Sequence, residues 1–252
     1  MVEKNIVEVD KNDSKTNIND RGAELIKGVK SGISIAIGYI PIAITFGLVA
    51  KSSGIPNMVS ILMSLLIFAG ASQFIGVNLM AHGATGLEIV MTTFILNFRH
   101  FLMSSSLTQK IYDKTTKKLL SVLAFGITDE TFAVASLCSE ERISPWFMLG
   151  LNFIAFISWN FGTWIGIFLG DAIPSSLKTS MNIALYAMFI GLLLPAIKES
   201  KPVFVVTFIA IFINCLLKWI PLFSFISMGW SIIISTVVAA AIGAVLYPKE
   251  VE

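Results

Sequence analysis

The sequence predicts an all-α, polytopic membrane protein with about seven or eight transmembrane segments, and three observations support that class. Of its 252 residues, 55% are hydrophobic and 13% are charged, whereas a soluble domain carries about 25% charged residues. Several apolar runs reach about 20 residues, the length that an α-helix needs to cross the hydrocarbon core. These runs are continuous and do not alternate with period two, which argues against a transmembrane β-barrel.

Residues 1–24 differ in composition from everything that follows. They contain six acidic and four basic residues and almost no apolar run. A signal peptide has a short basic start followed directly by an apolar core, so this pattern is not one. We expect a polar tail that is disordered up to about Asn19. Residues 25–252 are expected to form a single transmembrane domain.

Eight apolar segments are candidates for membrane-spanning helices. In chain order they are Ser31–Ala50, Met58–Met80, Ile89–Thr108, Leu119–Cys138, Pro145–Gly170, Met181–Ile197, Pro202–Lys218 and Phe225–Tyr247. The connections between them are too brief to fold as a soluble domain, so any chemistry is expected within or across the bilayer. The two cysteines, Cys138 and Cys215, lie far apart in apolar runs, and we expect buried apolar residues, not a disulfide or a metal site.

The distribution of lysines and arginines outside the apolar segments conflicts with a topology in which all eight segments cross the membrane. The tail, counted to Lys30, holds six of them, and the loop after the third segment holds four: Lys110, Lys114, Lys117 and Lys118. Both groups favour the cytoplasmic side, yet three crossings would place them on opposite sides. Either this chain departs from the rule that basic loops are cytoplasmic, or one of the first three segments does not cross the membrane. The N-terminus is expected to be cytoplasmic.

Two of the first segments contain residues that interrupt helices. In the first, "AIGYIPIAITFG" places Pro41 three residues after Gly38, and proline in a helix interior favours a kink. In the second, "FAGASQFIG" gathers Gly70, Ser72 and Gln73, and a broken or re-entrant helix there would reconcile the loop charges. A later pair, Gly191 and Pro195 in "IGLLLPAI", gives a weak indication of an inverted repeat.

The third segment, "ILNFRHFLMSSSL", places Asn97, Arg99 and His100 in an apolar run. An arginine at the bilayer centre costs about 2.5–3.5 kcal/mol, which roughly cancels the gain from the apolar residues around it. At 100° per residue Asn97 and His100 share one face, and Arg99 points away from it. Arg99 could instead reach the headgroups, but the basic loop begins eleven residues further on, at Lys110.

The fourth segment contains two adjacent acids, Asp129 and Glu130, in the middle of "FGITDETFAVA". An acid inside a membrane is kept by a partner, a proton or an ion. We expect Arg99 to pair with one of the two and the other to face a substrate or ion pathway.

The fifth segment carries weaker polar groups and a stripe of small residues. Asn152 and Asn160 lie eight residues apart on one face. Gly162, Gly166 and Gly170 repeat at four-residue spacing, which flattens one helix face and favours close packing against another helix.

Three strings together resemble the AzlC family of bacterial membrane proteins, the large subunit of branched-chain amino acid exporters. They are "GISIAIGYIPIAITFGLVA", "FAGASQF" and "ILNFRHFLMSSSL" with "TDETFA". The family pattern is matched at Gly38 and Pro41, from Phe68 to Phe74, from Asn97 to His100 and from Thr128 to Phe132. The similarity continues through "GDAIP" and "FIGLLLP", so it covers about Leu25 to Pro195.

The resemblance implies export of leucine, isoleucine and valine, with methionine as a further candidate, across a bacterial plasma membrane. It also implies a second, smaller membrane subunit of AzlD type. The chain has no Gly-x-x-x-x-Gly-Lys phosphate loop, which favours a secondary carrier, with proton coupling as one mode. No cofactor, metal or nucleic acid is expected, and membrane lipid surrounds the protein.

An amino acid substrate needs a cation or helix N-terminus for its carboxylate, an acid for its ammonium group and an apolar pocket. Arg99 or the backbone near Gly70 to Gln73 could bind the carboxylate. Asp129 or Glu130 could bind the ammonium group or carry the coupling proton. The predicted pocket walls are Phe74, Phe94 and Phe132.

Three other functions remain as alternatives. An intramembrane serine protease would use Ser72 as nucleophile and His100 as base, but the string "GASQ" that supports it is short. A scaffold without transport would have no need of buried acids and an arginine. The chain could also be the permease subunit of a larger complex.

Overall fold

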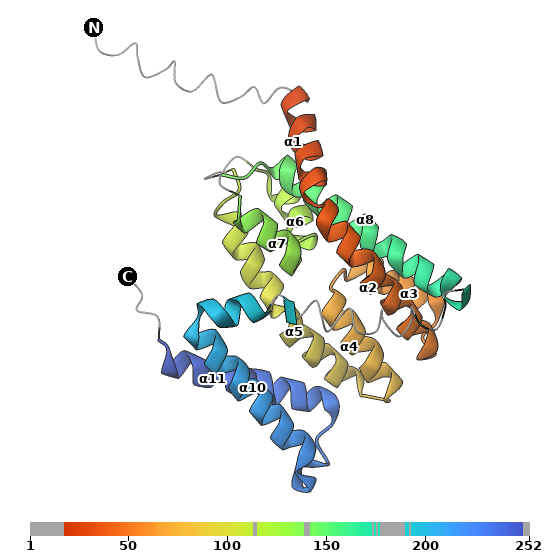
Figure 1. The fold of residues 1–252 in the computed structure, drawn as a ribbon, viewed down its shortest axis with the longest axis vertical. Coiled ribbons are helices and arrows are strands. Elements are labelled where there is room, and N and C mark those ends of the chain that lie inside the picture. Colours follow the sequence, from red (N-terminus) through yellow and green to blue (C-terminus); the bar gives the residue numbers. More distant parts are fainter. Residues whose placement is uncertain are drawn as a thin grey trace. The chain divides into compact units, whose positions relative to one another are not determined.

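The computed structural model describes residues 18–112, 115–138, 142–172, 174, 176, 190, 191 and 193–248. Within these residues the protein is all-α and polytopic, which confirms the predicted fold class (Figure 1). Four described helices are long and apolar enough to cross a membrane, or five if one sharply bent pair counts as a span. The four are α2 (Ile33–Ser52), α8 (Pro145–Leu169), α10 (Lys201–Trp219) and α11 (Met228–Leu246).

The chain divides into two compact units. Unit 1 comprises residues 1–38 and 100–158, and unit 2 comprises residues 39–99 and 159–252. Three continuous helices, α2, α5 (Gly86–Thr108) and α8, pass from one unit to the other. α5 matches the predicted third segment, but its polar residues Asn97, Arg99 and His100 leave it less apolar than the four spanning candidates.

In unit 1, α1 (Ile18–Ser31) packs closely against the first half of α8. A Cβ added to Gly28 would lie 2.0 Å from the carbonyl oxygen of Phe147, and one added to Gly150 would lie 2.1 Å from that of Leu25. Glycine at both positions therefore lets the two backbones touch. Helix already begins at Ile18, inside the segment for which the sequence predicts a polar tail.

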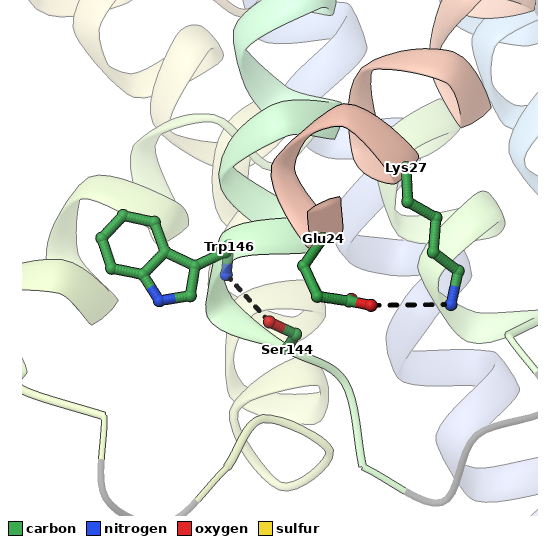
Figure 2. A network of polar contacts seen from close by, with 4 residues as sticks. All are labelled: Glu24, Lys27, Ser144 and Trp146. Atoms are coloured by element: carbon green, nitrogen blue, oxygen red, sulfur yellow. Dashed lines mark hydrogen bonds and ion pairs between the residues drawn. The ribbon is translucent and has the colours of Figure 1, made fainter. Parts of the chain in front are cut away.

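Polar and aromatic contacts fix the start of α8 near α1. The hydroxyl of Ser144 accepts a hydrogen bond from the backbone N–H of Trp146 at 3.3 Å, which caps α8 (Figure 2). The guanidinium of Arg21 lies 5.5 Å from the centre of the Trp146 ring. On α1 itself, Lys27 and Glu24 form an ion pair at 4.0 Å (Figure 2).

In unit 2, the second halves of α2 and α8 run side by side in the same direction. A Cβ on Gly162 would lie 2.8 Å from the carbonyl oxygen of Ile40, and one on Gly166 would lie 2.2 Å from that of Ile44. A Cβ on Gly170, the residue after α8, would lie 2.3 Å from the side chain of Leu48. The predicted packing role of this glycine stripe is confirmed.

α2 passes through Gly38 and Pro41 as one continuous helix. The Thr45 hydroxyl donates to the carbonyl oxygen of Pro41 at 2.9 Å, so a side chain bonds to the backbone one turn away. No break interrupts α2 at the predicted position, and a kink there stays a prediction.

The second predicted segment consists of two helices, α3 (Asn57–Leu66) and α4 (Gly70–Ala81). Between them Phe68 has a φ of 46°, in the left-handed region that non-glycine residues rarely adopt. Phe68 is nonetheless buried, with 2% of its surface exposed. The helix is therefore interrupted at a residue that packing holds in a strained conformation.

The fourth predicted segment, Leu119–Cys138, is not one continuous helix, and the structure corrects the prediction in that respect. It consists of α6 (Lys117–Phe125) and α7 (Asp129–Ser136), whose axes differ by 119°. Thr128 and Thr131 form a capping box, in which each side chain accepts a hydrogen bond from the other's backbone N–H. A capped N-terminus starts a new helix here, and the apolar composition of the segment conceals it.

The last two predicted segments are confirmed as α10 and α11, which pack on each other as a hairpin joined through η2 (Pro221–Phe223). The Asn214 amide donates to the hydroxyls of Ser231 at 3.2 Å and Ser235 at 3.4 Å, so polar contacts link the two helices. Most of the predicted sixth segment, Met181–Ile197, lies outside the described residues. A short η1 (Gly170–Ala172) follows α8.

Candidate functional site

The break in the second segment leaves the N-terminus of α4 without a side-chain cap. Ala69 is the N-cap residue and makes no side-chain capping bond. The first N–H groups of a helix have no acceptor within that helix, and here they belong to Gly70, Ala71 and Ser72. Such groups bind negatively charged ligands, because the helix dipole also favours negative charge at this end.

A directional chain of hydrogen bonds fixes α4 to α3 and α8 within unit 2. The side-chain oxygen of Gln73 accepts from the backbone N–H of Ala69 at 3.2 Å, and the side-chain NH₂ of Gln73 donates to the Ser64 hydroxyl at 3.0 Å. The hydroxyls of Ser64 and Thr163 lie 2.8 Å apart. Thr163 donates to the Trp159 carbonyl oxygen at 3.0 Å, so Ser64 must be the donor to Thr163. Gln73 and Thr163 are fully buried.

Ser72 joins α4 to α5. Its hydroxyl lies 2.9 Å from the Ala69 carbonyl oxygen and 2.9 Å from the side-chain oxygen of Asn97. Both partners are acceptors of the amide type, and neither can act as a general base. These contacts give no support to a nucleophilic role for Ser72.

Aromatic side chains form an apolar wall beside the N-terminus of α4. The Trp159 ring lies 2.7 Å from the point where a Cβ on Gly70 would sit, so the ring covers the first residue of the helix. Trp159 contacts Tyr39 and Phe46, with ring centres 5.5 Å and 6.3 Å away, and Phe46 contacts Phe74 at 5.5 Å. We call these four residues the aromatic wall.

Trp159 is also an unsatisfied donor. It is 3% exposed, and its indole nitrogen has no hydrogen-bond partner among the described residues. A buried N–H without an acceptor costs about 1–3 kcal/mol. An acceptor supplied by a ligand would remove that cost.

The remaining predicted site residues are distributed over both units. Arg99 belongs to unit 2, whereas His100, Asp129 and Glu130 belong to unit 1, and all four are partly exposed. Asp129 and Glu130 occupy the first turn of α7, where negative charge is favourable for the helix dipole. The pairing of Arg99 with one of these acids stays a prediction.

The three predicted pocket walls differ in their surroundings. Phe74 is part of the aromatic wall. Phe94 is 62% exposed and contacts Phe98, 6.2 Å away. Phe132 lies on α7 in unit 1. Among the described residues, His, Cys, Asp and Glu side chains form no group of three that could hold a metal ion.

Comparison with known proteins identifies the family. A family model described as "AzlC protein" matches residues 34–173. The chain belongs to the AzlC family. This range includes α4, α5, the α6–α7 pair and α8, so every predicted site residue lies in the part that the AzlC model covers. No solved structure matches the chain.

Relatives of this AzlC-family chain occur in bacteria and archaea. This chain is 33% identical over 185 residues to the inner membrane protein YgaZ of Escherichia coli, and the matched region covers 71% of this chain and 76% of YgaZ. It is 34% identical to an uncharacterized membrane protein of Archaeoglobus fulgidus, covering 71% and 78%. The branched-chain amino acid transport protein AzlC of Bacillus subtilis is 27% identical over 172 residues, covering 67% and 66%.

One contact of this AzlC-family chain, made by a buried acid, was not predicted from the sequence. Glu88 is 5% exposed, and its carboxylate accepts hydrogen bonds from the Ser227 hydroxyl and from the Gly229 N–H, the latter at 3.0 Å. It therefore caps the N-terminus of α11. The Thr85 side chain accepts from the Glu88 N–H at 3.3 Å, and that Thr-x-x-Glu spacing is a local capping signature. Nothing local indicates that the carboxylate would cap a helix 139 residues away.

Replacing Gln73 by leucine is expected to lower the stability of the AzlC-family chain by about 2–3 kcal/mol. The change removes the acceptor for the Ala69 N–H and the donor to Ser64 in a fully buried network, and leaving such groups unpaired is costly. Thermal unfolding of the purified protein in detergent measures the effect. Gln109→Leu, at an exposed position after α5, is the control; an equal loss in both variants would contradict the network's role.

Proposed function

We propose that this protein is a secondary carrier that exports branched-chain amino acids across a bacterial plasma membrane. The observation that carries the proposal is the uncapped N-terminus of α4 beside the aromatic wall and the unsatisfied Trp159 N–H. The name of the Bacillus subtilis relative agrees with this substrate class. Leucine, isoleucine and valine are the proposed substrates, with methionine as a further candidate.

The broken segment offers opposite partial charges to a zwitterion. The N–H groups of Gly70, Ala71 and Ser72 and the indole N–H of Trp159 suit a carboxylate. The last carbonyl groups of α3, which lack intrahelical donors, suit an ammonium group. Discontinuous helices that present both ends to a ligand are typical of substrate sites in secondary transporters. The aromatic wall suits a branched apolar side chain.

The proposed roles of the charged residues rest on the sequence. Arg99 is a second candidate for the substrate carboxylate. Asp129 and Glu130 are candidates for carrying a coupling proton, since acids at membrane depth serve proton transfer in carriers. An AzlD-type small membrane subunit is the proposed partner, and we propose that the N-terminus lies in the cytoplasm.

A protease function finds no support in the contacts of Ser72, whose hydroxyl lies against two carbonyl-type oxygens. Transport also explains a polar helix end beside an aromatic wall, for which a scaffold has no use. The protein is therefore proposed as a carrier and not as an enzyme.

Trp159→Phe is expected to weaken leucine binding about tenfold or more. The variant keeps the aromatic ring and removes the N–H, and a hydrogen bond to a charged group contributes about 1.5–3 kcal/mol. The half-saturating leucine concentration in counterflow, measured in proteoliposomes with and without the small subunit, reports the change.

Trp164→Phe is the matched control, because Trp164 lies on the same helix and is 51% exposed. It should leave counterflow unchanged. Equal behaviour of the two variants would remove Trp159 from the site. Absence of leucine counterflow in the unmodified protein with its partner present would remove the carrier proposal itself.

A further inference from the structure

The two ends of the α6–α7 segment are bonded to each other in unit 1. Ile111, before α6, forms a bridge with Ile143, after α7, and the Ile143 N–H donates to the Lys110 carbonyl oxygen at 2.7 Å. The Lys110 side chain also donates to the Ser136 carbonyl oxygen at 3.2 Å. Two ends in hydrogen-bond contact cannot lie on opposite faces of a hydrocarbon layer about 30 Å thick.

The dimensions of α6 and α7 agree with a segment that turns back. They contain 9 and 8 residues, so they are about 14 Å and 12 Å long, each less than half the membrane. At a bend of 119°, α7 returns toward the side from which α6 came.

The turn between α6 and α7 is held at depth against α8. The Asn152 amide donates to the Leu123 carbonyl oxygen at 2.9 Å, and a Cβ on Gly126 would lie 2.6 Å from Asn152. Asn152 lies about 10 Å along α8 from its first residue, Pro145. The turn therefore lies well inside the apolar layer that α8 crosses.

We propose that neither broken segment crosses the membrane. In this topology α6–α7 enters and leaves at the face that holds the N-terminal tail, and α3–α4 enters and leaves at the opposite face. The proposal concerns the path of the chain and does not depend on which substrate is carried. It places Asp129 and Glu130 at the turn of a hairpin anchored to the cytoplasmic face.

The direction of α8 extends the argument to α3–α4. In unit 1, α8 runs parallel to α1, which leads directly into α2, and in unit 2 it runs parallel to α2 itself. Both helices therefore start at the same face. Because α6–α7 returns to its own face, α5 ends where α8 starts. α5, about 34 Å long, then begins at the face where α2 ends. α3–α4, which connects them, must leave and rejoin that same face.

Loop charges favour the same topology. If both broken segments crossed, the tail and the loop containing Lys110, Lys117 and Lys118 would lie on opposite faces, against the positive-inside rule. If only one crossed, α2 and α8 would run in opposite directions, against their observed packing. With two hairpins that do not cross, both basic groups are cytoplasmic and both helices run in parallel.

Single cysteines at the hairpin ends test the proposal in the full-length protein. In a Cys138→Ala, Cys215→Ala background, Lys117→Cys and Leu137→Cys report the ends of α6–α7. A membrane-impermeant maleimide is applied to right-side-out and to inverted vesicles. Both cysteines should react only in inverted vesicles, as should Gly22→Cys, the marker of the tail face, where an added Cβ meets no atom within 4 Å.

Ser52→Cys and His82→Cys report the ends of α3–α4 and should both react only in right-side-out vesicles. Reaction of the two members of either pair from opposite faces would overturn the proposal. Where a position fails to react, Tyr112→Cys replaces Lys117→Cys and Asn57→Cys replaces Ser52→Cys. Native Cys138, in a Cys215→Ala background, replaces Leu137→Cys, and Ala81→Cys replaces His82→Cys. These results decide the topology whether or not leucine is transported.

Discussion

Replacing Gly166 by valine is expected to prevent the protein from accumulating in folded form. A Cβ at this position would lie 2.2 Å from the backbone carbonyl oxygen of Ile44 and 3.0 Å from the Cα of Gly47. Both obstacles are backbone atoms, so no rotation of a side chain can relieve the clash. The helices α2 and α8 would have to separate, and the close packing that holds small-residue interfaces together in membranes would be lost. We expect a loss of about 3 kcal/mol or more.

The yield of monodisperse protein after detergent extraction and its unfolding temperature measure this effect. Gly86→Val is the matched control, because Gly86 begins α5 and an added Cβ meets no atom within 4 Å. The control should be recovered at nearly the yield of the unmodified protein. Normal yield and stability of Gly166→Val would show that α2 and α8 do not touch at this point.

The long helices could be predicted from the sequence because their signal is local. Runs of about 20 apolar residues identify α2, α8, α10 and α11 within a few residues of their ends. The glycine stripe on α8 likewise predicted a close contact from spacing alone, although it could not name α2 as the partner.

The break within the fourth segment was missed because composition conceals it. The break consists of Gly126, Ile127 and Thr128. These residues do not lower the mean hydropathy of the fourth segment enough to divide it into two. The information lies in the spacing of Thr128 and Thr131, which form the capping box, and in the two acids that follow, which suit the first turn of a helix. Interpreted as helix-start signals, these residues would have divided the segment.

The candidate site could be predicted only in part. The small residues around Gly70 and Ser72 indicated a break, which lies just before Gly70, and Gln73 in the first turns of α4 accepts from the Ala69 N–H. Trp159 and Phe46 come together with them through contacts between residues far apart in the chain, and no spacing rule reveals such contacts. The cap that Glu88 supplies to α11 could not be predicted for the same reason.

Neutralising the charged residues is expected to have the largest effect on transport. Arg99→Gln, Asp129→Asn and Glu130→Gln should each reduce leucine counterflow about a hundredfold at normal expression. Charges at membrane depth are costly and persist where they serve substrate or proton binding. Glu24→Gln, which removes a partly exposed ion pair on α1, is the control and should transport normally.

Double variants test the prediction that Arg99 pairs with Asp129 or Glu130. Leaving one charge of a pair without its partner is more harmful than removing both, so Arg99→Gln combined with the correct acid variant should transport better than Arg99→Gln alone. The other acid, if it carries the coupling proton, should when neutralised permit leucine exchange but abolish the response to a pH gradient. Additive losses in both double variants would exclude the ion pair, and full transport by all three single variants would remove these residues from the mechanism.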